Sequence, residues 1–186
     1  LAGKYTGLEV SAANTMEECW DLVNTHEETG SHLMILENVN YRRDVLAVLN
    51  MVKQNVFGEL VHFRCGYQHD LRFVKLNDGK SAYGKGVEFG EKGISESAWR
   101  TQHSLLRNAD VYPTHGLGPI CQAMNINRGD KMDYLTSMMG NDFTLKQRIA
   151  EKAKEDPFFE QFVGWDMRGN MDIQMIRTNK GRTILI

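Results

Sequence analysis

The pattern of apolar and polar positions in the first third of the chain predicts a strand, a helix, a second strand and a second helix. Thr15 and Glu18 have the spacing of a capping box and Gly30 supplies a left-handed stop, so the first helix is expected between them. Residues 32–36, which include the apolar run Leu33–Leu36, indicate a buried strand, and apolar residues recur at helical spacing over 45–52. The order strand, helix, strand is typical of a parallel crossover unit. The positions expected to form the apolar face of the first helix are Met16, Cys19, Trp20 and Val23.

From Glu59 the period of the pattern changes from that of a helix to that of a strand. Val61, Phe63 and Cys65 alternate with polar neighbours, which predicts a half-buried strand. Continuing the alternation places Tyr67 on the same face, beyond the apolar part, where a polar tip suits a site at the sheet edge. The later elements expected are a loop over 77–93, a helix around 117–124 with Pro119 in its first turn, a strand over 132–139, a charged helix over 143–155, and a hairpin of 171–177 and 182–186.

This change of pattern divides the chain into two predicted domains. Residues 1–57 have the alternating character of an α/β domain, and residues 58–186 that of an α+β domain. The chain starts at Leu1 without a leader, and its last residues have the pattern of a strand in progress. We therefore expect a segment cut at both ends.

Composition and charge exclude several classes of protein. Twenty-two Lys and Arg residues against 24 Asp and Glu residues give a net charge of −2, so the chain lacks the basic excess of a nucleic-acid-binding protein. The three cysteines are widely spaced and form no C-x-x-C pair, so neither a disulfide framework nor a zinc site is expected. No apolar run approaches the roughly 18 residues of a membrane span.

The most informative motif for chemistry is the run YPTHGLGP at 112–119. It places a phenol and an imidazole ahead of a predicted helix N-terminus, and Gly116 and Gly118 allow close backbone approach to a ligand. A capped turn around a satisfied histidine explains the same residues equally well. Glu37 and Asn38 end the second predicted parallel strand, where open α/β sheets bind ligands, although turn chemistry also explains them. The glycines at 84–90 lack the strand-to-helix context of a dinucleotide fingerprint and favour a loop.

Several separate motifs, in one order, resemble glycoside hydrolase family 109, a family of NAD-dependent α-N-acetylgalactosaminidases built on the glucose-fructose oxidoreductase plan. The resemblance is dense up to about residue 139. The motifs are EVS at 9–11, ENVNYRR at 37–43, GYQHDLR at 66–72, VEFGEK at 87–92, WR at 99–100, YPTHGLGP at 112–119 and MNINRG at 124–129.

The resemblance implies a fold and a reaction. The implied fold class is α/β: the last part of a Rossmann-type dinucleotide-binding domain at 1–57, followed by an α+β domain with a mixed open sheet at 58–186. The implied reaction uses bound NAD to oxidise the sugar at C3, which makes the C2 proton acidic. Removal of this proton, departure of the aglycone, addition of water and return of the hydride complete the cycle. This is an exception to the usual pair of catalytic carboxylates.

By motif match, the resemblance also assigns residues to roles. It implies that Glu9, Val10 and Asn38 contact NAD. Tyr67 and His115 are the implied catalytic residues, with Glu37 and His69 beside them as residues that orient them. No metal ligand is implied. The implied sugar pocket consists of Tyr67, Arg100, Tyr112, Pro113, Thr114 and His115.

Two rival functions remain open from the sequence: an NAD(P)-dependent sugar oxidoreductase of the same plan, and a non-catalytic sugar-binding relative. Sugar dehydrogenases of this plan carry Glu-Lys-Pro where this chain has Glu9, Val10 and Ser11, which disfavours a plain dehydrogenase because Val10 cannot transfer a proton. The expected partner is a glycan or glycoconjugate, and the resemblance leaves room for a homo-oligomer. It leaves the compartment open, with export favoured because relatives are often exported.

Overall fold

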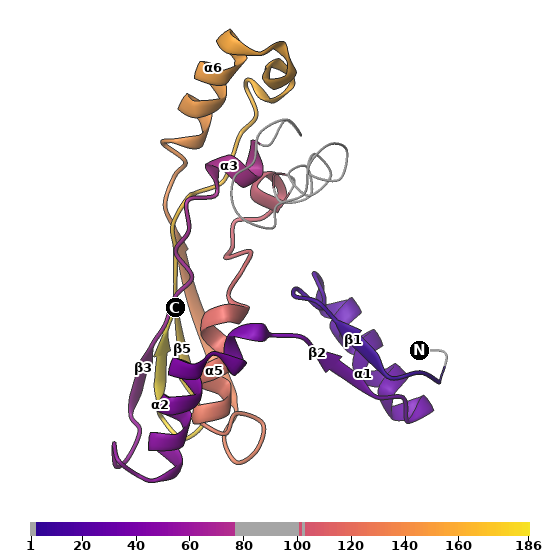
Figure 1. Cartoon of the computed structure of the whole chain (residues 1–186), viewed down its shortest axis with the longest axis vertical. Coiled ribbons are helices and arrows are strands. Elements are labelled where there is room, and N and C mark those ends of the chain that lie inside the picture. The colour runs from indigo at the N-terminus through magenta and orange to yellow at the C-terminus, as the bar shows by residue number, and fades with distance from the viewer. Residues whose placement is uncertain (1–2, 77–100, 102) are drawn as a thin grey trace. The chain divides into compact units, whose positions relative to one another are not determined.

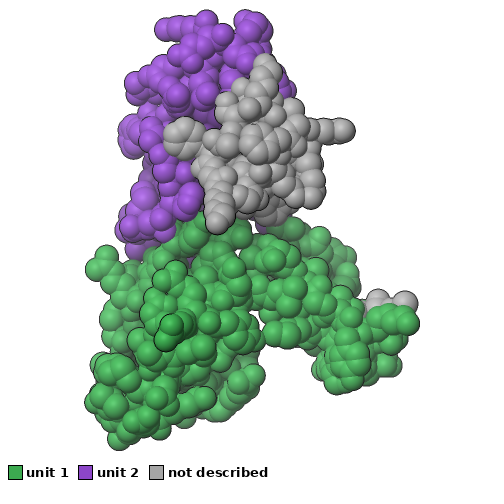
Figure 2. Space-filling view, viewed as in Figure 1, with its two compact units in different colours: residues 1–67, 112–134, 176–186 green, residues 68–111, 135–175 purple. Residues whose placement is uncertain are grey.

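The computed structural model describes residues 3–76, 101 and 103–186 of the chain. These fall into two compact units, shown in different colours in Figure 2. The first unit contains residues 1–67, 112–134 and 176–186, and the second contains 68–111 and 135–175. The units group segments by contact, so the predicted domain boundary between residues 57 and 58 stays a prediction.

The first unit begins with the predicted crossover. Strands β1 (Thr6–Leu8) and β2 (Leu33–Ile35) are parallel neighbours, and helix α1 (Met16–Thr29) connects them (Figure 1). The predicted capping box is present, because the Thr15 hydroxyl accepts from the Glu18 N–H while the Glu18 carboxylate accepts from the Thr15 N–H. Gly30 closes the helix at φ 64°, as predicted.

The predicted apolar faces of this crossover are not buried within the described chain. Met16 and Trp20 on α1 are 73% and 59% exposed, and Met34 and Ile35 on β2 are about half exposed. The expectation of a buried strand here was therefore wrong. The physical reason is that a sheet of two short strands offers one helix too little apolar surface to cover either face.

The remainder of the first unit contains the elements that position the site. A 3₁₀-helix, η1 (Asn38–Tyr41), leads into α2 (Arg43–Lys53), and β3 (His62–Arg64) follows a turn. Helix α5 (Thr114–Ala123) comes next. Its start three residues before Leu117 makes the prediction for Pro119 wrong, since Pro119 lies inside the helix rather than in its first turn.

The second sheet contains four strands in the order β3-β6-β5-β4. Strand β6 (Thr183–Leu185) is parallel to β3 and follows β5 (Asp172–Thr178) through a short hairpin. Strand β4 (Met132–Met139) has the predicted limits. The sheet is mixed, so the predicted fold class is confirmed. Its apolar cluster joins α5 to the strands and contains Ile120, Met124, Ile176 and Ile184, with Phe63 and Cys65 packed against them.

The second unit has its own core. It contains α3 (Arg72–Lys75), α6 (Leu145–Glu155) and η2 (Pro157–Phe162), with Asp142 accepting hydrogen bonds from the first backbone N–H groups of α6. Phe159 is buried, whereas Met138 on β4 is 76% exposed and does not contribute to the core. The core cluster consists of Leu76, Leu145, Ile149, Phe159, Phe162 and Met167.

Hydrogen bonds to Asp130 connect the β5–β6 hairpin to the turn before β4. Its buried carboxylate accepts hydrogen bonds from the Thr178 hydroxyl at 2.8 Å and from the backbone N–H groups of Lys131 and Lys180 at 2.9 and 3.2 Å. Burial alone raises the pKa of Asp130, but these hydrogen bonds and the charge of Arg182 outweigh it, so the pKa lies below its ordinary value.

We expect Asp130→Asn to lower the melting temperature by several degrees near neutral pH, because the ionised form accepts three hydrogen bonds that the amide only partly replaces. Because the pKa of Asp130 is lower in the folded state, its ionised form stabilises the fold at pH values above the unfolded-state pKa of about 4. This stabilisation is lost as the pH falls through the pKa of the folded state. The difference from wild type should therefore shrink below about pH 4. Thermal unfolding against pH measures it, with Asp133→Asn as an exposed control. A pH-independent difference would contradict the prediction.

Candidate functional site

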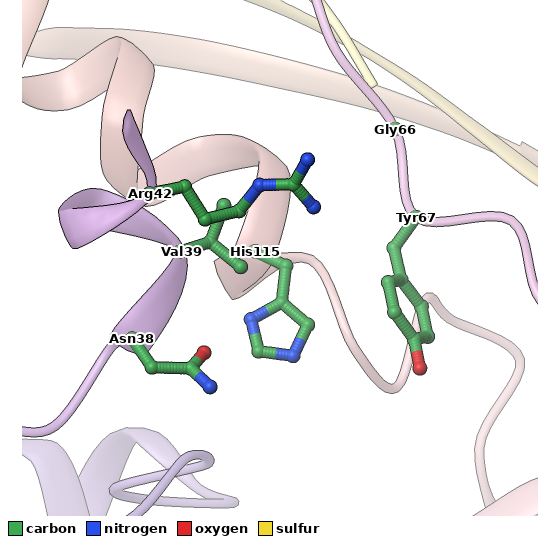
Figure 3. A pocket seen from close by; sticks show the side chains of 6 residues that line it. All are labelled: Asn38, Val39, Arg42, Gly66, Tyr67 and His115. Carbon is green, nitrogen blue, oxygen red and sulfur yellow. The ribbon is translucent and has the colours of Figure 1, made fainter. Parts of the chain in front are cut away.

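The candidate site is a pocket of about 340 Å³ in the first unit. This volume lies within the range of small-molecule sites. Figure 3 shows that its lining comes from three places in the chain: the η1 turn, the segment after β3 and the first turn of α5. The lining residues are Asn38, Val39, Arg42, Gly66, Tyr67 and His115.

His115 is held by Glu37. The Nδ1 atom of His115 lies 2.8 and 3.0 Å from the two carboxylate oxygens of Glu37, which is only 5% exposed. When the Glu37 carboxylate is ionised it can only accept, so Nδ1 carries the shared proton and Nε2 is the acceptor of the corresponding neutral tautomer. The backbone N–H of Val39 donates to the same carboxylate at 2.9 Å, because Glu37 is the N-cap of η1. One carboxylate therefore fixes both a turn and the orientation of an imidazole.

Tyr67, Tyr112 and His115 form a cluster of three rings. The ring centroids of Tyr67 and His115 are 5.1 Å apart, those of Tyr67 and Tyr112 are 5.1 Å apart, and those of Tyr112 and His115 are 4.8 Å apart. These are ordinary distances for tilted and edge-to-face aromatic pairs. The cluster joins the strand-end residue and the helix residue that the sequence had singled out.

Two glycines allow α5 to pack closely against the segments beside it. A Cβ atom on Gly116 would lie 2.9 Å from the Cys65 Sγ atom and 3.2 Å from the backbone nitrogen of Gly66, and one on Gly118 would lie 2.8 Å from the Glu37 Cγ atom. The close approach that these glycines allow is therefore to β3 and to η1, within the protein itself. This differs from the expected approach to a ligand.

The residues predicted to contact NAD lie on two neighbouring strand ends. Glu9 and Val10 follow β1, and Asn38 follows β2 at the same edge, where the Leu36 N–H donates to the Leu8 carbonyl. Asn38 lines the pocket, but Glu9 and Val10 are not among its lining residues.

The other predicted residues are divided between several places. Pro113 is the N-cap of α5, and Thr114 is its first residue, with a buried hydroxyl that has no hydrogen-bond partner in the described part of the chain. His69 belongs to the second unit, and Arg100 lies outside the described residues, as do the glycines at 84–90.

Three lining residues were not singled out from the sequence: Val39, Gly66 and the charged residue Arg42. Arg42 lies four residues after Asn38, on the turn that runs from η1 into α2. Arg42 ends η1 with an extended backbone (φ −66°, ψ 142°), so helical spacing from Asn38 does not indicate it. Its place in the ENVNYRR motif at 37–43 was the only signal in the sequence. In the part of the chain that the structure describes, no group of three or more His, Cys, Asp and Glu residues is arranged to hold a metal, and none of the described helices is long and apolar enough to cross a membrane.

Solved structures of low sequence identity share this fold. An oxidoreductase domain protein from Kribbella flavida aligns with a TM-score of 0.62 at 14% identity, covering 99% of this chain and 41% of the other. An inositol dehydrogenase homologue from Azotobacter vinelandii, solved in complex with NAD⁺, aligns with a TM-score of 0.59 at 14% identity, covering 99% of this chain and 39% of the other. The chain therefore shares its α/β fold with these proteins.

Sequence comparisons give closer relatives. An α-N-acetylgalactosaminidase from Tannerella forsythia is 49% identical over 185 residues, and a glycosyl hydrolase family 109 protein from Parabacteroides distasonis is 48% identical over 186 residues. The alignments cover 98% of this chain but 39% and 40% of those proteins, so the chain spans about two fifths of their length. The family model for the glycosyl hydrolase 109 C-terminal domain matches residues 41–186. The chain belongs to glycosyl hydrolase family 109.

Proposed function

We propose that this chain supplies the sugar-binding part of a glycosidase that removes terminal α-linked N-acetylgalactosamine with the help of NAD. The observation that carries the proposal is the Glu37–His115 pair, which holds an imidazole in a fixed orientation beside Tyr67 in a pocket of suitable size. The relative from Tannerella forsythia is an α-N-acetylgalactosaminidase, which supports the choice of substrate.

The composition of the pocket supports a mechanism without paired carboxylates. Most glycosidases place two carboxylates across the scissile bond, roughly 5 to 10 Å apart. Among the described residues that line this pocket there is no Asp or Glu. The carboxylate of the adjacent Glu37 is buried and already accepts hydrogen bonds from His115 and the Val39 N–H. NAD-dependent glycosidases are a recognised exception to the two-carboxylate rule.

The position of the pocket fits NAD. In open α/β sheets, dinucleotides bind outside the carboxyl ends of parallel strands, and both Glu9 and Asn38 follow such ends on the neighbouring strands β1 and β2. In the proposed complex these two residues and Val10 hold the cofactor. When bound, NAD⁺ supplies a hydride acceptor for C3 of the sugar and a hydride donor at the end of the cycle.

The side chains of the pocket supply the proton transfers. His115 accepts the C2 proton of the 3-keto sugar at Nε2, and the Glu37 carboxylate stabilises the imidazolium that results. Tyr67, with its ring against His115, donates a proton to the departing glycosidic oxygen and takes one from the water that replaces it. Tyr112 packs against both rings and keeps them in place.

To test the proposal, the protein expressed from the complete gene is assayed with a chromogenic α-N-acetylgalactosaminide. NADH absorbance is followed in the same cuvette. We expect the aglycone to be released without accumulation of NADH, because the hydride taken from C3 is returned. In heavy water, mass spectrometry should find one deuterium at C2 of the released sugar, because the proton removed there is replaced from solvent.

Each other outcome identifies a different error. NADH that accumulates without aglycone release would indicate a sugar oxidoreductase, and sugar binding without either signal would indicate a non-catalytic relative. Aglycone release without deuterium at C2 would leave the glycosidase activity standing and refute the elimination mechanism.

A further inference from the structure

Arg42 lines the pocket, yet the proposed mechanism gives it no role. Its side chain extends from the end of η1 toward the space that also contains His115 and Tyr67 (Figure 3). The side chain is 64% exposed, which places the guanidinium at the rim of the pocket. It is the only Lys or Arg among the described lining residues.

Asp44 fixes the orientation of this guanidinium. The Nε atom of Arg42 donates to one carboxylate oxygen at 3.1 Å, and Nη2 donates to the other at 2.8 Å. Asp44 is itself fixed at the start of α2, where it accepts from the Val45 N–H at 3.0 Å. A bidentate pair of this kind fixes the guanidinium plane and uses two of its five N–H groups.

The same ion pair determines the kind of ligand group that Arg42 suits. The charge of Asp44 offsets that of the guanidinium, and its hydrogen bonds from Arg42 hold the pKa of the carboxyl below its ordinary value. The rim therefore presents a guanidinium of fixed orientation that is paired with Asp44 and has N–H groups left to donate. These N–H groups can donate to a carbonyl or hydroxyl oxygen of a ligand.

We propose that Arg42 donates a hydrogen bond to the carbonyl oxygen of the sugar's 2-acetamido group and thereby selects N-acetylated sugars. This inference rests on the proposed function. If His115 removes the C2 proton, C2 lies close to the imidazole, and the acetamido group that C2 carries lies within the pocket that Arg42 also lines. Of the other donors in the pocket, Tyr67 and His115 serve proton transfer and Asn38 serves the cofactor.

The test compares two substrates that differ in one atom: a chromogenic α-N-acetylgalactosaminide and its thioacetamido analogue, in which sulfur replaces the carbonyl oxygen and accepts hydrogen bonds poorly. With the protein expressed from the complete gene, wild type should prefer the oxygen substrate by about 10- to 100-fold in kcat/KM, the size of one charge-assisted hydrogen bond. Arg42→Met should lose most of this preference by losing activity on the oxygen substrate alone.

Two further variants separate this role from a structural one. Asp44→Asn should reduce the preference partially, because the guanidinium remains but is no longer fixed by a charged bidentate partner. Arg43→Met, which removes the adjacent arginine that does not line the pocket, should keep the wild-type preference. Circular dichroism and bound NAD are measured for every variant.

The outcomes distinguish this inference from the proposed function. A wild-type enzyme that releases no aglycone overturns both. An active wild type together with an Arg42→Met variant that keeps the oxygen preference overturns the role of Arg42 alone. Equal loss on both substrates, or loss of bound NAD, would likewise overturn it, because Arg42 would then support the fold or the cofactor rather than the acetamido group.

Discussion

Replacing His115 with Ala should lower kcat of the full-length enzyme by about 10²–10⁴-fold, and Tyr67→Phe should have an effect of similar size. Proton transfer by a positioned side chain contributes this much to rate. Neither side chain belongs to the two apolar cores, so bound NAD should change little, and Tyr67→Phe should leave thermal stability almost unchanged. His115→Ala should also lower the melting temperature by a few degrees, because the buried Glu37 carboxylate loses its imidazole partner. The measurements are kcat, melting temperature and NAD content of the purified variants.

The double variant adds a sharper criterion. If Tyr67 and His115 act as one unit, as their ring contact suggests, the double variant should be little worse than the worse single variant. His26→Ala, which removes an exposed histidine on α1, is the matched control and should keep wild-type turnover. A single variant with near-normal kcat and bound NAD would remove that residue from the catalytic assignment.

Gly116→Ala should lower both stability and turnover. The new methyl group would lie 2.9 Å from the Cys65 Sγ atom and 3.2 Å from the Gly66 backbone nitrogen, so α5 must move away from the end of β3. Overpacking of this kind costs about 1–3 kcal/mol, which exceeds the gain of up to about 1 kcal/mol from the better helix propensity of Ala. Since α5 carries His115, a shift of about 1 Å can reduce kcat about 100-fold.

Chemical denaturation and steady-state kinetics of the same preparation measure both effects. Gly140→Ala is the matched control, because a methyl group there would meet only the Met171 carbonyl at 3.9 Å, an ordinary contact. A Gly116→Ala protein as stable and active as wild type would show that the contact between α5 and β3 does not position the imidazole.

Local signals in the sequence predicted local structure well. The Thr15 capping box, the Gly30 stop and the limits of β4 follow from short-range hydrogen bonding and side-chain alternation, and the structure confirms them. Alternation after Phe63 also placed Tyr67 beyond the apolar part of β3, where it lines the pocket. The predictions of the capping box, the helix stop and the strand limits succeeded because each depends on neighbours within a few residues.

Features that depend on tertiary packing were not predictable in this way. The pair of Glu37 and His115 joins residues 78 positions apart, and only the resemblance to relatives had placed them side by side. Gly116 and Pro119 lie inside helix α5, although glycine and proline usually lie at or beyond the ends of helices. Packing of α5 against β3 and η1 overrides this local propensity. The exposed apolar faces of α1 and β2 could not be foreseen, since periodicity does not indicate what covers a face.

The parallel pairing of β3 with β6 has a consequence for the order of folding. β3 leads directly into Gly66 and Tyr67, and its hydrogen-bonded neighbour is Thr183–Leu185, about 120 positions later in the chain. Closure of so long a loop is slow, and during synthesis this edge of the pocket has no partner strand until those residues leave the ribosome. The crossover that carries Asn38 is local and can form early. We therefore expect the pocket to assemble in two stages, with the wall that contains Tyr67 completed last.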